Sequence, residues 1–156
     1  SNSEQWGSGT YYGDGSGGLL GSYPTLRRCG ASVVKVNSSG QVTLTVYSSL
    51  PGTVQTVPRA EHFALILLLR KATPNSALEY VTDHKNLALN FPKGLEVNKS
   101  NINSDLYWEI YDTIRAKNLA LTIRWMPSHK SAENIPQGVS LVDLRANAVA
   151  DDLAGR

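Results

Sequence analysis

Cysteine and methionine are almost absent from this sequence, and no long apolar run is present. The 156 residues include one cysteine, Cys29, and one methionine, Met126. A single thiol excludes an internal disulfide and an all-cysteine metal site, and it suits a reducing compartment. The longest apolar run, residues 63–69, is too short to cross a bilayer, and no signal peptide is visible. The sequence therefore predicts an intracellular protein, in the cytoplasm or the nucleus, without a membrane partner.

An excess of charge is also missing, since the net charge is only +2. Composition alone therefore does not indicate a nucleic-acid partner, and any basic surface would be local. A hydrophobic content of 41% and a charged content of 18% are typical of a folded domain. The chain begins with Ser1 rather than Met, which suggests processing or excision from a longer protein. We expect residues 1–9 to be a flexible leader and residues 10–156 to form one domain.

Strand and helix patterns follow one another in the order β-β-β-α-β-α-α-β-α. A Ser-Ser-Gly turn joins the second and third strands, and Pro58 and Ser104 are typical of helix starts. The expected strands cover 10–16, 29–37, 42–50, 78–83 and 119–129, and the expected helices cover 57–72, 84–91, 104–118 and 141–155. Helices that cross between the later strands imply parallel pairing beside an antiparallel meander. The sequence thus predicts an α/β fold with a mixed five-stranded sheet flanked by helices.

Four acidic residues lie at boundaries of these elements. Asp14 lies in or just after the first strand, among the glycines of TYYGDGSGG, and Glu61 lies in the first turn of the first helix. Asp83 ends the fourth strand, and Asp151 lies in the last helix. Strand ends and helix starts meet at one edge of such sheets, so these acids are expected to converge. Clustered carboxylates repel one another without a cation, and oxygen ligands favour Mg²⁺ or Mn²⁺. Individually, each acid is also compatible with a turn, a helix cap or a solvated surface.

The motifs YGDGSGG, RAEHFALIL, YVTDHKNL, WMPSHK and NAVADDLAG, in this order, resemble the type 1 ribonuclease H family along nearly the whole chain. WMPSHK is most similar to the ribonuclease H domains of retroviral and retrotransposon reverse transcriptases. The resemblance implies a ribonuclease H-like fold and an endonuclease that cuts the RNA strand of RNA/DNA hybrids with two Mg²⁺ ions, which Mn²⁺ can replace. It also implies a covalently linked reverse transcriptase domain as a partner. The metal-binding and catalytic acids would be Asp14, Glu61, Asp83 and Asp151, assisted by His129.

The connection after His129 departs from the family pattern because it is long. Its residues 130–146 include Asp143, which is a rival to Asp151 as the fourth ligand. We prefer Asp151, because Asn147 and the ADDLA segment around it match the family motif. His62 and His84 match no functional position, and we expect them to be structural.

The segment before Glu61 departs as well, since many family members place amide side chains there to contact ribose hydroxyls. Val57 and Pro58 offer no side-chain donors. A basic helical protrusion is also absent, so that phosphate contacts would come from scattered lysines. We expect the substrate contacts to come from backbone amides and from four side chains: Ser16, Gln55, Thr56 and Lys85.

Three alternatives to a hybrid-cutting nuclease remain open at this point. The first is a non-catalytic nucleic-acid-binding domain of the same fold, against which the retained acids argue. The second is an integrase-like or transposase-like nuclease, which needs a late glutamate where the last helix offers Asp151. The third, a purely structural module, leaves the clustering of the acids unexplained.

Overall fold

The computed structural model describes residues 6–18, 20–23, 25–127 and 135–156. Five strands form one sheet in the order β3-β2-β1-β4-β5. The strands are β1 (Gly9–Ser16), β2 (Gly30–Val36), β3 (Val42–Ser49), β4 (Ala77–Thr82) and β5 (Ala120–Trp125). The helices are α2 (Val57–Lys71), α3 (Lys85–Asn90), the 3₁₀ turn η1 (Phe91–Lys93), α4 (Leu95–Asn98), α5 (Ser104–Lys117) and α6 (Leu141–Ala154). The element order expected from the sequence is confirmed, except that the short elements η1 and α4 were not expected.

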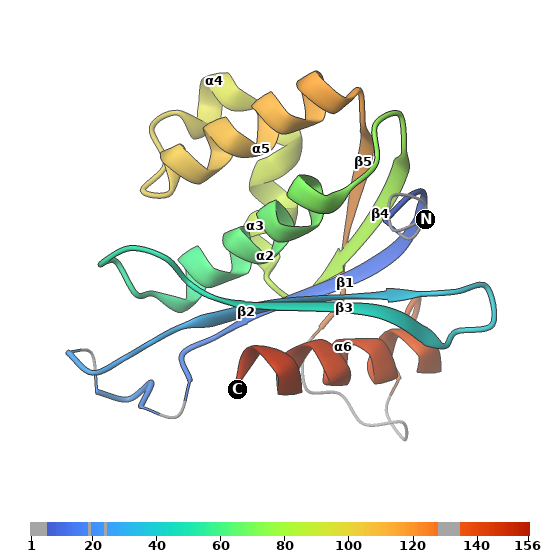
Figure 1. The fold of residues 1–156 in the computed structure, drawn as a ribbon, viewed down its shortest axis with the longest axis horizontal. Coiled ribbons are helices and arrows are strands. Elements are labelled where there is room, and N and C mark those ends of the chain that lie inside the picture. The colour runs from blue at the N-terminus through green and yellow to red at the C-terminus, as the bar shows by residue number, and fades with distance from the viewer. Residues whose placement is uncertain (1–5, 19, 24, 128–134) are drawn as a thin grey trace.

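The sheet is mixed, as the sequence predicts. β1 pairs antiparallel with β2, and β2 pairs antiparallel with β3. β1 pairs parallel with β4, and β4 pairs parallel with β5. Figure 1 shows α2, α3, α4 and α5 on one side of the sheet and α6 alone on the other. The end of β1 therefore lies between two helical layers.

The helix α2 forms the centre of the core because its sequence is apolar on nearly all sides. Every residue from position 60 to position 69 is buried. A second, smaller apolar cluster lies under α6, where Ala146 and Ala150 pack against Tyr12, Val34 and Val81. Among the residues that the structure describes, no helix is long and apolar enough to cross a membrane.

Gly15 allows α2 to approach β1 unusually closely. A Cβ atom on Gly15 would lie 2.5 Å from the backbone nitrogen of Glu61 and 2.8 Å from the Cβ of Ala60. Neither distance is compatible with a side chain, and a backbone neighbour cannot rotate away. The glycine next to Asp14 in the sequence therefore brings the acid of α2 against the acid of β1.

Two local expectations differ from the structure. Residues 6–9 were expected to belong to a flexible leader, but Trp6 stacks on Tyr11 with ring centroids 6.1 Å apart, and β1 already begins at Gly9. The helix α5 is capped by Asn103 rather than Ser104. Asn103 is the N-cap because its carbonyl accepts a hydrogen bond from the Tyr107 N–H, at 3.2 Å, and Ser104 is the first helical residue.

Gly15→Ala should destabilise the protein by about 1–3 kcal/mol, because the added methyl group overpacks the contact between β1 and α2. Gly17→Ala is the matched control, since its Cβ would meet no atom closer than 3.3 Å. Urea denaturation measures both free energies of unfolding. Equal stability of the two variants would contradict the close-approach explanation.

Candidate metal centre

Three carboxylates converge beyond the paired ends of β1 and β4. The pairing of these strands ends at Tyr12 and Val81, and Asp14 and Asp83 follow each of them by two residues. Glu61 reaches the same place from α2. One oxygen atom from each of the three acids lies within 4.8 Å of the others. The fold thus brings together three of the four acids singled out in the sequence.

Glu61 owes its position to tertiary packing rather than to the helix dipole. The first turn of α2 holds no acid, and Glu61 is its fifth residue, so the expectation that it lies in the first turn was wrong. It is almost completely buried. The dipole acts mainly within the first turn, and it gives no reason for a carboxylate at this depth.

Burial and mutual repulsion govern the electrostatics of the centre. Burial, followed by the charge of Glu61, raises the pKa of Asp14 far above its usual range. Burial also raises the pKa of Glu61, although hydrogen bonds from Asp14 and the Gly15 backbone oppose this. Among the described residues, Asp14 Oδ2 and Glu61 Oε2 are buried without a hydrogen-bond partner. Unpartnered buried carboxylate oxygens at this spacing fit a hard divalent cation.

Asp151 reaches the same cluster from the opposite face of the sheet. It is exposed on α6, yet it lies close enough to contribute to the raised pKa of Asp14. Ser32, which pairs with Asp14 across β1 and β2, donates a 2.5 Å hydrogen bond to the carbonyl of Ala150. This bond fixes the turn of α6 that carries Asp151 beside Asp14. No sequence pattern singles out Ser32, because only the strand register places it beside Asp14.

Asp143 lies in the first turn of α6, within the helix expected over 141–155, and not in the long connection to which it was also assigned. It forms a capping box with Ser140 and accepts two 2.9 Å hydrogen bonds from Arg124 and one from the Tyr12 hydroxyl. Burial acts to raise its pKa, but the Arg124 and Tyr12 hydrogen bonds outweigh this and lower it to about 2. This carboxylate is therefore occupied by a structural ion pair that ties α6 to β5 and β1.

The three histidines fall into different situations. His129 lies outside the described residues. His62 is buried, with Nδ1 2.7 Å from the Pro58 carbonyl and Nε2 2.8 Å from the Tyr107 hydroxyl. His84 packs edge-on against His62, with ring centroids 5.6 Å apart. His62 is thus a structural residue between α2 and α5, as the sequence analysis expected.

The expected substrate-contacting side chains are partly engaged elsewhere. The Gln55 amide bonds only to main chain: it accepts from the Cys29 N–H at 2.7 Å and donates to the carbonyls of Leu50 and Gly52, both at 2.9 Å. It therefore braces the loop that precedes α2. Thr56 is the N-cap of that helix, and its hydroxyl accepts from the Arg59 N–H.

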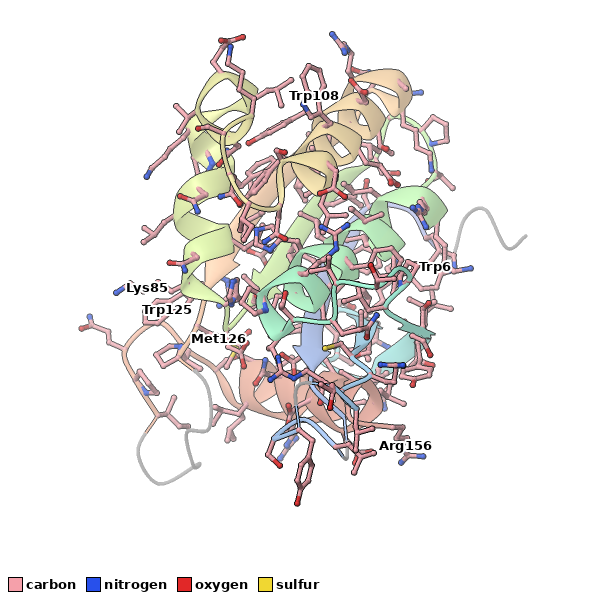
Figure 2. The ribbon with its side chains drawn as sticks, turned by 90° about the vertical axis from the view of Figure 1, so that its left-hand side faces the viewer. Trp6, Lys85, Trp108, Trp125, Met126 and Arg156 are labelled. Carbon is pink, nitrogen blue, oxygen red and sulfur yellow. The ribbon has the colours of Figure 1, made fainter. Side chains whose placement is uncertain are left out.

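Ser16 and Lys85 each follow one of the acids, Asp14 and Asp83, by two residues in the sequence. The Ser16 hydroxyl accepts a 3.1 Å hydrogen bond from the Gly18 N–H at the end of β1. The Lys85 ammonium lies 5.3 Å from the centre of the Trp125 ring, whose Nε1 donates to the Asp83 carbonyl at 3.2 Å. Figure 2 shows Lys85 and Trp125 side by side at the surface. Trp125 was not singled out in the sequence, although it opens the WMPSHK motif.

The sequence and the structure of the chain were compared with those of known proteins. No family model matches the sequence, and no curated protein matches it either. The solution structure of the ribonuclease H domain of PFV matches with a TM-score of 0.69 at 23% identity, over 94% of this chain and 92% of that one. The chain has the ribonuclease H fold. Its resemblance to ribonuclease H domains, first seen in short motifs, is confirmed in three dimensions.

Two further solved structures share this ribonuclease H fold. LC11-RNase H1, solved in complex with an RNA/DNA hybrid, matches with a TM-score of 0.65 at 18% identity, over 92% of this chain and 91% of that one. The foamy viral protease-reverse transcriptase, solved in complex with an RNA/DNA hybrid, matches with a TM-score of 0.69 at 19% identity. The match covers 94% of this chain but only 19% of that protein.

The raised pKa of Asp14 makes the stability of the metal-free protein depend on pH. The folded protein keeps this proton to a higher pH than the unfolded chain does, so the resulting stabilisation is complete below about pH 4 and is lost as the pH rises. We expect the Tm measured in EDTA to fall from about pH 5 to pH 8. Asp14→Asn should flatten this dependence and exceed the wild-type Tm at the upper end. Parallel curves for the two proteins would show that Asp14 carries no such shift.

Substitution of Asp143 should lower the stability of the protein, whereas substitution of Asp151 should leave it almost unchanged. Asp143→Asn breaks the bidentate pair with Arg124, which keeps its 3.6 Å contact with Glu79, and should cost about 1–3 kcal/mol of stability. Asp151→Asn removes an exposed side chain and should leave stability within about 0.5 kcal/mol of wild type. Thermal unfolding of the two matched variants tests this difference, and a larger loss for Asp151→Asn would reverse the assignment.

Proposed function

We propose that this chain is a metal-dependent endonuclease that hydrolyses the RNA strand of RNA/DNA hybrids. The observation that carries the proposal is the convergence of Asp14, Glu61 and Asp83 with two buried, unpartnered oxygens. Keeping such groups charged in a core is costly unless a cation neutralises them. The ribonuclease H fold provides the context in which this cluster is a site for two Mg²⁺ or Mn²⁺ ions.

Four acids of the chain would hold the ions. Asp14 and Glu61 form the buried floor of the centre, whereas Asp83 is half-buried and Asp151 is exposed. The scissile phosphate therefore approaches from the side of the two more accessible carboxylates. Two bound divalent ions would supply activation of the attacking water and charge stabilisation of the leaving 3′ oxygen. His129, which follows β5 in the sequence and lies outside the described residues, is proposed to assist proton handling or product release.

Recognition of the RNA strand is proposed to lie along the start of α2. The 2′-hydroxyl distinguishes RNA from DNA in the wide, shallow minor groove of A-form-like helices. Because Glu61 must meet the scissile phosphate, the segment just before it lies beside that groove. Thr56 and nearby backbone amides are the proposed donors, because Arg59, which is nearer to Glu61 along the chain, is paired with Asp105. Gln55 acts by holding their loop. Ser16 and Lys85 complete the substrate contacts.

The partner and setting follow from the same reasoning. Much of the hybrid contact would come from a covalently linked reverse transcriptase domain, since the residues before and after the acids carry few unpaired cations for phosphate binding. The solved foamy viral protease-reverse transcriptase, which contains a domain of this fold and was solved with a hybrid, supports this arrangement. The single, buried Cys29 fits a reducing cytoplasm or nucleus.

The direct test is incubation with a labelled RNA/DNA hybrid, with and without Mg²⁺, beside duplex DNA, duplex RNA and single strands. We expect Mg²⁺-dependent cleavage of the RNA strand of the hybrid alone. Asp14→Asn and Asp83→Asn should reduce turnover by at least about 10³-fold while the proteins stay folded, because charge stabilisation is usually the largest catalytic contribution. Asp143→Asn should keep the turnover of its folded fraction. Hybrid binding without cleavage would instead favour a non-catalytic domain.

A second test locates the RNA-sensing contacts with hybrids that carry one 2′-deoxy substitution at each position around the cut. Each lost hydrogen bond should slow cleavage by about fivefold, equivalent to roughly 1 kcal/mol. Thr56→Val removes the hydroxyl and should erase the penalty at one nucleotide. An unchanged penalty profile in Thr56→Val would place the contacts elsewhere.

A further inference from the structure

Tyr80 is a buried polar residue that the proposed reaction does not yet use. It lies in β4, three residues before Asp83, and its side chain is completely buried. Its hydroxyl makes no hydrogen bond to any residue that the structure describes. A buried hydroxyl without a hydrogen-bond partner is less favourable than an apolar side chain of the same shape. Its position calls for a physical reason.

Gly13 shows where the hydroxyl points. A Cβ atom on Gly13 would lie 1.7 Å from the Tyr80 hydroxyl oxygen and 2.4 Å from the ring carbon that carries it. The Tyr80 ring thus leans along the sheet into the space left by the missing side chain at Gly13, which is the residue before Asp14. A small residue in β1 and a large one in β4 together direct a hydroxyl group to the base of the acidic cluster.

Three unsatisfied polar atoms therefore lie in one buried region. One of them, the Tyr80 hydroxyl, is a donor, and the other two, Asp14 Oδ2 and Glu61 Oε2, are carboxylate oxygens that can accept. Burial raises the pKa of Tyr80 well above its usual value, and Glu61 makes the largest contribution among the neighbouring acids. Tyr80 is consequently a neutral hydroxyl throughout the working pH range and can only help the carboxylates as a hydrogen-bond donor.

We propose that Tyr80 is a positioning residue of the metal centre, whose hydroxyl donates a hydrogen bond to the inward-facing oxygen of Glu61 when divalent ions occupy the cluster. This inference rests on the proposed metal-dependent function. Glu61 is the preferred acceptor because Gly13 and Gly15 share one face of β1. The Tyr80 hydroxyl lies against Gly13 and the backbone of Glu61 lies against Gly15 on that face. Residues that orient metal ligands commonly change metal affinity or activity by about 10–100-fold when they are replaced.

The proposal predicts opposite effects of the hydroxyl in the two states of the protein. Without metal the hydroxyl is unsatisfied, so Tyr80→Phe should be as stable as wild type or more stable. With metal the hydroxyl orients Glu61, so Tyr80→Phe should bind Mg²⁺ more weakly. A residue that only packs the core would change stability equally with and without metal.

Tyr11→Phe is the matched control. Tyr11 is the direct neighbour of Tyr80 across β1 and β4, is equally buried, and donates its hydroxyl to the Gly7 carbonyl at 2.6 Å, away from the acids. Calorimetric titration with Mg²⁺ and with Mn²⁺, together with the Tm in EDTA and in Mg²⁺, measures both variants and wild type. We expect about a tenfold weaker Mg²⁺ affinity for Tyr80→Phe and no change for Tyr11→Phe.

The possible results distinguish a failure of the proposed role of Tyr80 from a failure of the proposed metal-dependent function. Wild-type binding of Mg²⁺ with equal affinity in Tyr80→Phe overturns the role of Tyr80 and leaves the nuclease proposal standing. Absence of binding by wild type overturns both. If Tyr80→Phe does not fold, wild-type protein labelled with ¹³C at the tyrosine ζ carbons provides the test. The Tyr80 signal should move on addition of Mg²⁺ while that of Tyr11 does not, and an unmoved Tyr80 signal contradicts the proposal.

Discussion

The repulsion between carboxylates that the fold forces together is the constraint on which the rest of the structure depends. Asp14 and Glu61 are buried side by side, and Asp83 closes the group within 4.8 Å. Nothing in the apolar core requires these charges. Because Gly15 has no side chain, α2 can pack directly against β1, and this contact places Glu61 next to Asp14. This packing increases the repulsion between the two carboxylates, and a bound cation would relieve that repulsion.

On the other face of the sheet, specific hydrogen bonds hold the helix α6 so that Asp151 lies next to the buried acids. Asp143 anchors the start of α6 through Arg124 and Tyr12, and Ser32 anchors its later part through the Ala150 carbonyl. Between them, these bonds fix the turn that carries Asp151. Asp143 is thus buried and paired, while Asp151 is left exposed beside Asp14. Their environments, rather than their residue type, separate the two roles.

Much of the fold could be predicted from the sequence because its signals are local. The Ser-Ser-Gly turn, Pro58 at the start of α2 and the alternating strands each determine structure within a few residues, and the element order follows from them. The convergence of Asp14, Glu61 and Asp83 could also be expected, because strand ends and helix starts share an edge of the sheet.

What the sequence could not provide depends on tertiary contacts. In the sequence, Gln55 looks like a polar side chain available for substrate. In the folded protein, main-chain groups of the loop take up its amide oxygen and amide nitrogen. Asp143 is a possible metal ligand in the sequence, because its partner Arg124 lies 19 positions away and no local pattern shows the pairing. The hydroxyl of Tyr80 and the gap at Gly13 lie on neighbouring strands, and only the register of β1 and β4 brings them together.

The most direct measurement of the central claim is the number of protons released when Mg²⁺ binds. Calorimetric titration at one pH in buffers of different ionisation enthalpy gives this number without reference to catalysis. If Asp14 and Glu61 share a proton in the metal-free protein, binding should release about one proton per chain near neutral pH, and Asp14→Asn should abolish the release. Tight binding of Mg²⁺ with no proton released would contradict the account of the buried carboxylates given above.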